Sequence, residues 1–234
     1  MNFPTIKANL ARVGRLVSPQ MIHYGNGILN YLNLGRWFHD RGLQIPVRCP
    51  SRQSLYDHVR TCVEEPVTYL EFGVFKGDSL RHWTTLLKHP DSVLHGFDSF
   101  EGLPEDWGKV DREYLNVRGA MPHFDDSRVR LFKGWFSETL PGYVSGLKPH
   151  GALVIYLDAD LYSSTIFVLN QLRQFIREGT ILVFDEFWDR EHEMRAFTEF
   201  IDEQGLEIKC LAATRTLSQV AFQITGSRQT SASP

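Results

Sequence analysis

The stretch ALVIYLDADLYSST, residues 152–165, joins a continuous apolar run to two aspartates and then to three hydroxyl side chains. An apolar run of this length suits a β-strand that is covered on both faces, as in a parallel sheet. The helical pattern from Ser163 to Ile176 predicts a helix directly after the two aspartates. A strand, a short loop and a helix in this order are typical of an α/β fold.

Six further apolar runs extend this pattern over residues 66–224. They are VTYLEF (67–72), VLHGFD (93–98), VRLFKG (129–134), TILVFDEF (180–187), LEIKCLA (206–212) and SQVAFQI (218–224). Only residues 213–217 separate the last two runs, too few for a crossover helix, so these runs should form an antiparallel hairpin. We therefore predict a Rossmann-like, doubly wound α/β sheet of seven strands, mostly parallel, with a C-terminal antiparallel hairpin.

The chain has 234 residues, of which 42% are hydrophobic, and this length suffices for one full domain and some additional residues. The additional residues are 1–60, whose short helical patterns predict an N-terminal helical cap. We expect this cap to act as a lid or as a segment for homo-oligomer formation. Residues 61–225 form the main domain, and the polar residues 226–234 predict a disordered tail. Within the main domain, residues 99–128 lack periodicity and predict a long loop that shapes a binding pocket.

Composition argues against several classes of partner. Acidic residues exceed basic ones by 28 to 25, a net charge of −3, so a nucleic-acid partner is not expected. No stretch approaches the roughly 18 to 20 apolar residues that span a bilayer, and the N-terminus has no apolar core of a signal peptide. We therefore expect a cytoplasmic protein without a membrane partner. The three cysteines have no CxxC spacing and predict neither a disulfide framework nor a thiolate zinc site.

Polar residues that follow the apolar runs are the candidate site, because ligands of open α/β sheets bind beyond the carboxyl ends of the strands. The run at 67–72 contains Glu71 and leads into a loop with Gly73 and Gly77. These glycines allow a ligand to approach the backbone closely, but their spacing differs from the dinucleotide motif G-x-G-x-x-G. Asp98 ends the run at 93–98, at the position where a ribose-binding acid would lie, although an aspartate there also suits a turn.

Four acids follow two of the later runs: Asp158, Asp160, Asp185 and Glu186. If the two strands are neighbours, these carboxylates meet at one edge, where they repel each other unless a cation or protons compensate. Carboxylate oxygens suit Mg²⁺ better than zinc. The alternative is that the hydroxyl residues after Asp160 cap a helix while Asp160 and Glu186 stay solvated.

With these residues assembled, the chain resembles the class I S-adenosylmethionine-dependent methyltransferases, and within them the macrocin O-methyltransferase group. The resemblance covers about residues 66–224. It rests on YLEFGVFKGDS (69–79), HGFDSFEGLPEDW (95–107), FKGWFSETLP (132–141), YLDADLYSSTIFVL (156–169) and GTILVFDEF (179–187).

The resemblance implies S-adenosylmethionine as cofactor and a small-molecule hydroxyl as acceptor, such as a sugar of a glycosylated natural product. It implies cofactor contacts for the methionine part at Glu71, Gly73, Gly77 and Ser79, for the ribose at Asp98 and Ser99, and for the adenine at Gly134, Trp135 and Phe136. Asp158 is implied as a further cofactor-binding residue.

The resemblance also implies a catalytic centre. It assigns a Mg²⁺ site to Asp158, Asp185 and Glu186, and the role of general base to Asp160, with Asp158 beside it in catalysis. The acidic pair is Asp-Glu in this chain, whereas the best metal-binding members of the group have Asp-Asp.

Several other functions remain open from the sequence. A phenol or catechol acceptor needs less activation than a sugar, because its pKa is near 10. A binding protein with this fold but without catalysis is a second alternative. An NAD-dependent oxidoreductase is disfavoured by Phe75, which stands where the dinucleotide motif needs glycine, and a metal-dependent hydrolase lacks a convincing phosphate loop or nucleophile.

Overall fold

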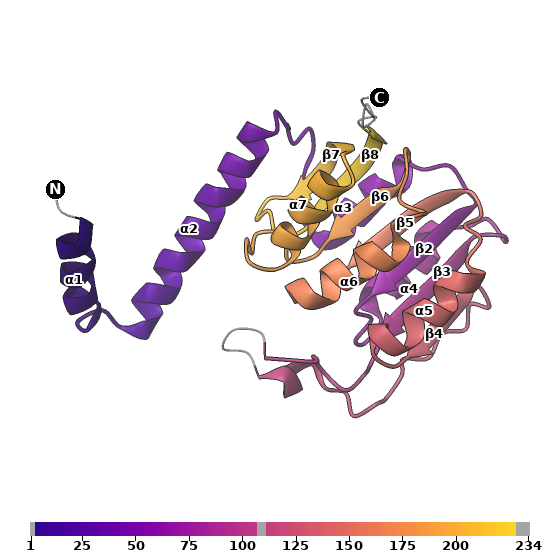
Figure 1. The fold of residues 1–234 in the computed structure, drawn as a ribbon. Helices are drawn as coiled ribbons and strands as arrows, with labels where there is room; N and C mark the ends of the chain where they lie inside the picture. Colours follow the sequence, from indigo (N-terminus) through magenta and orange to yellow (C-terminus); the bar gives the residue numbers. More distant parts are fainter. Residues whose placement is uncertain (1–2, 107–110, 228–234) are drawn as a thin grey trace, which may run out of the picture. The chain divides into compact units, whose positions relative to one another are not determined.

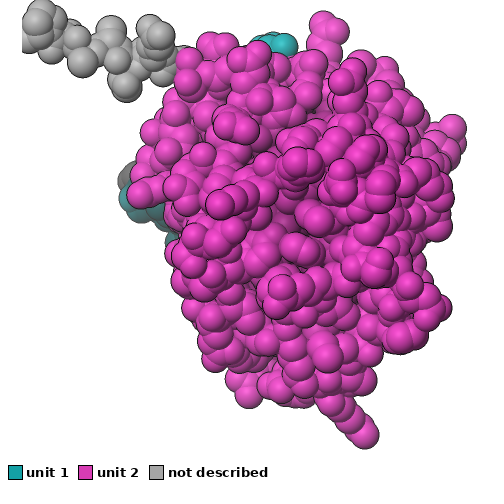
Figure 2. Space-filling view, turned by 90° about the vertical axis from the view of Figure 1, so that its right-hand side faces the viewer, with its two compact units in different colours: residues 1–42 teal, residues 43–234 magenta. Residues whose placement is uncertain are grey.

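The computed structural model describes residues 3–106 and 111–227, and it divides into two compact units, residues 1–42 and 43–234 (Figure 2). The smaller unit contains α1 (Phe3–Gly14) and α2 (Pro19–Asp40). Ser18 caps α2, because its hydroxyl accepts a hydrogen bond from the Met21 N–H at 3.2 Å. These helices agree with the helical patterns of the N-terminal segment, whose role as a lid or oligomer segment stays a prediction. The predicted disordered tail lies largely outside the described residues.

The larger unit is built on one eight-stranded sheet (Figure 1). In the order β1-β7-β8-β6-β5-β2-β3-β4, neighbouring strands are parallel, except that β8 runs antiparallel to β6 and β7. The strands are β1 (Arg48–Cys49), β2 (Val67–Phe72), β3 (Val93–Asp98), β4 (Val129–Lys133), β5 (Ala152–Leu157), β6 (Ile181–Phe184), β7 (Leu206–Thr214) and β8 (Val220–Ser227).

This topology confirms the predicted doubly wound, mostly parallel sheet with its C-terminal antiparallel hairpin. The seven apolar runs correspond to β2 through β8. The additional strand, β1, has only two residues and pairs in parallel with β7 at the edge of the sheet. A strand so short has no hydrophobic periodicity, which is why the sequence pattern did not reveal it.

Helices cover both faces of the sheet (Figure 1). One face carries α3 (Arg52–Thr61) and α4 (Asp78–Leu86), and the other carries α5 (Phe136–Gly146), α6 (Tyr162–Leu172) and α7 (Glu193–Glu203). The helix α3 lies in the larger unit, although the sequence pattern had grouped residues up to 60 with the N-terminal segment. None of the described helices combines the length and the apolar character that a membrane span requires.

The central strand β2 shows why the site at its end is held firmly. All six of its residues are buried. The Tyr69 ring packs against Trp83 of α4 at 4.7 Å between centroids, while on the other face Phe72 stacks on Phe97 of β3 at 4.9 Å. Burial of each large apolar side chain contributes about 1.5–3 kcal/mol, so the two packed faces fix where the strand ends.

Gly73, directly after β2, packs closely against the backbone of Asp158, and this contact can be tested. Its φ is +96°, and a Cβ there would lie 1.9 Å from the carbonyl oxygen of Asp158. Gly179 is a matched control, since its φ is +91° and a Cβ there would meet nothing within 4 Å. Both alanine variants carry the left-handed strain of about 1–2 kcal/mol, and Gly73→Ala adds an overpacking cost of about 1–3 kcal/mol. Urea unfolding should therefore show a larger loss for Gly73→Ala, and equal losses would contradict this packing.

Candidate functional site

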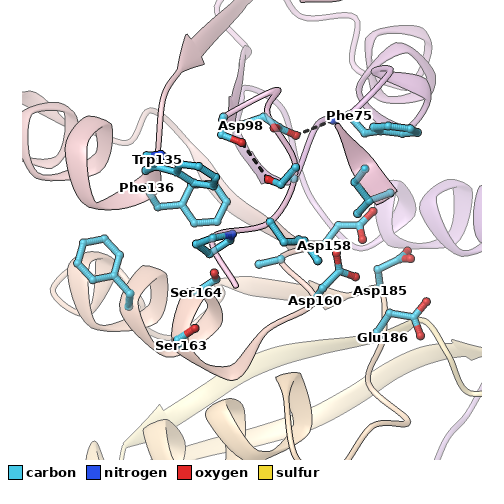
Figure 3. Close-up of a pocket in the computed structure, with 18 of the residues that line it drawn as sticks. Phe75, Asp98, Trp135, Phe136, Asp158, Asp160, Ser163, Ser164, Asp185 and Glu186 are labelled. Carbon is cyan, nitrogen blue, oxygen red and sulfur yellow. Dashed lines mark hydrogen bonds between the residues drawn. The ribbon is translucent and has the colours of Figure 1, made fainter. Parts of the chain in front are cut away.

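A cavity of about 860 Å³ opens beyond the carboxyl ends of the central strands (Figure 3). Its volume lies within the range of small-molecule sites. Most of the residues that the sequence singled out line it: Gly73, Asp98, Ser99, Gly134, Trp135, Phe136, Asp158, Asp160, Asp185 and Glu186. The topology thus gathers residues from the ends of five strands into one chamber, with Trp135 and Phe136 on one side and the acids on the other (Figure 3).

Three predicted cofactor residues are not among the residues that line this cavity. Glu71 is fully buried, and its carboxyl group accepts hydrogen bonds from the Ser79 and Tyr69 hydroxyls, both at 2.6 Å. Burial raises the pKa of Glu71 to about 8. Gly77 precedes α4 with a φ of +80° and lies against Pro122 and Phe124. These residues flank or support the loop between β2 and α4, and their direct contact with a cofactor stays a prediction.

Asp98 has a structural task that its position in the sequence did not reveal. Its carboxylate accepts a hydrogen bond from the backbone N–H of Phe75 at 2.7 Å (Figure 3). It also accepts hydrogen bonds from the backbone N–H groups of Val74 at 2.8 Å and Phe100 at 2.6 Å. These bonds stabilise two residues in the left-handed region, Phe75 (φ 50°) and Phe100 (φ 59°). Asp98 therefore fixes the loop after β2 to the end of β3, and its role toward a ribose stays a prediction.

We call Asp158, Asp160, Asp185 and Glu186 the acidic rim. Burial is the main reason that the pKa of all four is raised, and the charges of neighbouring acids add to it for Asp158, Asp160 and Glu186. The pKa of Asp158 is raised well above its ordinary value, and that of Asp160 rises to about 7 through burial and then the charge of Glu186.

Asp160 also has an unusual backbone. Its φ is 56°, in the left-handed region that a non-glycine residue rarely adopts, and the residue is only 5% exposed. Strain of this kind costs about 1–3 kcal/mol and collects at functional sites, where the surrounding structure holds it. The backbone at Asp160 thus places its carboxyl group on the wall of the cavity.

Arg52, the first residue of α3, compensates part of the negative charge, and sequence reasoning missed it. Its Nη2 lies 2.5 Å from Oδ2 of Asp185. The other carboxylate oxygen of Asp185 accepts a hydrogen bond from the hydroxyl of Tyr156, which in turn accepts one from the Tyr56 hydroxyl at 2.7 Å. No local motif could have shown the ion pair, because its partners are 133 positions apart.

The predicted Mg²⁺ site of Asp158, Asp185 and Glu186 is not assembled in the structure. Both carboxylate oxygens of Asp185 have protein partners, and Glu186 accepts a hydrogen bond from the indole N–H of Trp188. Among residues 3–106 and 111–227, no group of three or more histidine, cysteine or acidic side chains is placed to hold a metal ion. The sequence showed the oxygen donors but not the guanidinium that already pairs with Asp185.

Glu193 of α7 is a second residue that the sequence did not reveal. It is fully buried, and its carboxyl oxygens accept hydrogen bonds from the backbone N–H of Ala159 at 3.3 Å and of Glu186 at 2.9 Å. Ala159 stands between two rim aspartates and Glu186 is itself in the rim. Glu193 therefore braces both acidic loops against the same helix.

The long loop that was expected to shape a pocket does line the cavity. It contributes Gly102, Leu103, Pro104, Tyr114 and Leu115 to the wall. A backbone bridge between Glu101 and Asn116 organises the loop, and the Ser163 hydroxyl of α6 donates a hydrogen bond to Glu105 at 2.6 Å. Trp107, within the same loop, lies outside the described residues.

The model of the family described as Macrocin-O-methyltransferase (TylF) matches residues 52–214, which include the whole cavity. The chain belongs to this family. It is 33% identical over 159 residues to 8-demethyl-8-(2,3-dimethoxy-alpha-L-rhamnosyl)-tetracenomycin-C 4'-O-methyltransferase of Streptomyces olivaceus, an alignment that covers 56% of this chain and 59% of the relative. The chain thus spans less than two thirds of that relative's length.

Two further family comparisons agree with the fold and the resemblance. The chain is 28% identical over 181 residues to Demethyldecarbamoylnovobiocin O-methyltransferase of Streptomyces niveus, covering 63% of this chain and 67% of the relative. The crystal structure of CalS11, a calicheamicin methyltransferase, superposes with a TM-score of 0.58 over 74% of this chain and 80% of that chain, at 22% identity. The superposition supports the fold alone.

The buried carboxyl group of Glu71 makes stability depend on pH. Because its folded pKa of about 8 exceeds the ordinary value of 4.5, the folded state binds more protons between these limits, and its contribution to stability is lost as the pH rises through them. Glu71→Gln has no proton to lose. The free energy of unfolding of the wild type, relative to this variant, should therefore fall from pH 5 to pH 8, by at most about 1.4 kcal/mol per pH unit. Parallel pH profiles in urea titrations would contradict the assignment.

Proposed function

We propose that this chain transfers the methyl group of S-adenosylmethionine to a hydroxyl oxygen of a small molecule, and that the acceptor is a sugar of a glycosylated natural product. Membership of the macrocin-O-methyltransferase family and the names of the two relatives support the reaction class. The observation that carries the proposal is Asp160, a buried carboxyl group with a pKa of about 7 on the wall of the cavity.

The cavity suits S-adenosylmethionine by its chemistry. An excess of carboxyl groups favours a ligand that carries a sulfonium and an ammonium charge. In this proposal Gly73 and Asp158 contact the methionine part of the cofactor, and Asp98 and Ser99 contact its ribose. The rings of Trp135 and Phe136 contact the adenine, and all six residues line the cavity. The bound cofactor supplies a methyl group already activated for attack by an oxygen.

Asp160 supplies the base that a sugar hydroxyl needs. A sugar hydroxyl is a weak acid, so its oxygen becomes a good nucleophile only as its proton leaves. With a pKa of about 7, Asp160 is partly ionised at neutral pH and still basic enough to take that proton. Asp160 accepts the proton as the oxygen–carbon bond forms and the sulfur–carbon bond breaks, and it then releases the proton to water.

The neighbours of Asp160 position this base. Burial and then the charge of Asp185 raise the pKa of Asp158 well above its ordinary value, which disfavours a second negative charge beside Asp160. Glu193 fixes the loop between the two aspartates through the N–H of Ala159. The aromatic and loop residues of the wall exclude water, which strengthens the electrostatic interactions inside.

Asp160→Asn tests the base directly. The amide keeps the size of the side chain but accepts no proton, so kcat should fall by about 10²–10⁴-fold, while the dissociation constant for S-adenosylhomocysteine in calorimetry stays unchanged. Asp125→Asn is the matched control, since the Asp125 side chain is 98% exposed, and should keep full turnover. Wild-type kcat should rise with pH through about 7 as Asp160 ionises. An Asp160→Asn protein with wild-type turnover would refute the assignment.

The acceptor class is tested with a panel of rhamnosides, other glycosides, simple phenols and catechols, each incubated with cofactor labelled in the methyl group. Glycosides should gain the label on a sugar oxygen, which mass spectrometry of the products locates. Label on phenols or catechols alone would leave methyl transfer in place and refute the sugar acceptor. No label on any compound, with cofactor binding intact, would favour the non-catalytic alternative.

A further inference from the structure

Arg52 is the only basic residue among the described residues that line the cavity. It lines the cavity together with the four carboxyl groups of the acidic rim and pairs directly with Asp185. This guanidinium therefore supplies positive charge at the rim. In a site of this kind, a divalent cation is the usual alternative source of positive charge.

The fold holds Arg52 in this place. Ser51 caps α3 by accepting a hydrogen bond from the Ser54 N–H at 3.1 Å, and the fully buried Leu55 and Tyr56 anchor the first turn of the helix on the sheet. The guanidinium thus starts from a rigid position and reaches Asp185, whose side chain is only 2% exposed, at 2.5 Å. A hydrogen bond between two ionised groups at this distance is among the strong ones.

Asp185 has no carboxylate oxygen free of a protein partner. Oδ2 pairs with Arg52, and Oδ1 accepts the hydrogen bond of the Tyr156 hydroxyl. A metal ion at either oxygen would share it with a hydrogen-bond donor and would lie beside a guanidinium that repels it. Removing Asp185 from the predicted ligands leaves Asp158 and Glu186, and the latter bonds to the Trp188 indole.

Arg52 retains donors for a ligand. A guanidinium has five N–H groups, and within the described part of the chain only Nη2 contacts a carboxylate. The Arg52 side chain is 40% exposed, and it lines the same cavity as Asp160. An oxygen-rich, uncharged acceptor could therefore accept hydrogen bonds from Arg52 while one of its hydroxyls faces the base.

We propose that Arg52 takes the place of a divalent cation in the acidic rim, so that the chain works without a bound metal and uses the remaining N–H groups of Arg52 to hold an uncharged polyol acceptor. The second half of this inference rests on the proposed methyl transfer. The first half concerns only what binds to the rim, and it is measured without any reaction.

The binding test uses the electron paramagnetic resonance signal of free Mn²⁺, titrated with the purified full chain. The wild type should leave the signal unchanged. Arg52→Met removes the charge but keeps a long side chain and frees a carboxylate oxygen of Asp185, so this variant should bind Mn²⁺ and reduce the signal. Arg52→Lys retains the charge and should again leave the signal unchanged.

Arg60→Met is the matched control. Arg60 lies on the same helix and forms a comparable ion pair with Glu65, but it does not line the cavity. This variant should not bind Mn²⁺. Stoichiometric Mn²⁺ binding by the wild type that is lost in Asp185→Asn would overturn the proposal, and this result does not require that Arg52→Met folds.

The activity test uses an acceptor found with the panel above. Turnover of the wild type should survive EDTA and gain nothing from Mg²⁺, whereas Arg52→Met should raise the KM for the acceptor at least tenfold and leave the KM for the cofactor unchanged. Arg52→Lys should recover part of the loss. A requirement for Mg²⁺ would overturn the proposal. Absence of all methyl transfer would instead count against the proposed function and leave the Mn²⁺ result to decide the role of Arg52.

Discussion

The ion pair between Arg52 and Asp185 is the interaction on which the rest of the site depends. Four carboxyl groups meet beyond the ends of β5 and β6, where burial and mutual repulsion disfavour their ionised forms. Removing Arg52 would leave the carboxylate of Asp185, whose side chain is only 2% exposed, without its ion-pair partner. The position of Arg52 therefore affects how much negative charge the rim can carry.

The same interaction joins the core of the sheet to the site. Tyr156 belongs to β5 and is fully buried, yet its hydroxyl donates to Asp185 and receives a hydrogen bond from Tyr56 of α3. The rings of Tyr56 and Tyr156 also pack edge to face at 5.4 Å. Packing on the α3 face of the sheet thus controls the orientation of a carboxylate in the cavity. Glu193 does the same from the opposite face through the loops that it braces.

Much of the fold could be predicted from the sequence because each strand is a short apolar run with breakers on both sides. The runs at 67–72 and 93–98 have the same limits as β2 and β3. The helix α5 was missed because Pro141 and Gly142 interrupt its pattern. Strand ends that carry acids predicted the cavity lining, since parallel strands bring their carboxyl ends to one edge.

The contacts inside the site could not be predicted, because they join distant parts of the chain. The spacing of acids shows possible ligands for a cation, but it does not show which cation neutralises them. Arg52 lies on a helix that precedes the whole sheet core, and nothing in its local sequence points to Asp185. For the same reason, the bonds of Asp98 to the backbone N–H groups of Val74 and Phe75 became visible only in the structure. The long-range pairing of Arg52 with Asp185 therefore bears on the metal site, which stays a prediction, while the predicted fold is confirmed.

The most direct measurement is a crystal structure of the full chain grown with S-adenosylhomocysteine and soaked in Mn²⁺, with anomalous data that locate manganese. We expect cofactor density in the cavity between Gly73 and Trp135, an intact Arg52–Asp185 pair and no anomalous peak at the acidic rim. Manganese between Asp158 and Asp185, with Arg52 turned away from the carboxylate, would contradict this expectation, as would cofactor density outside this cavity.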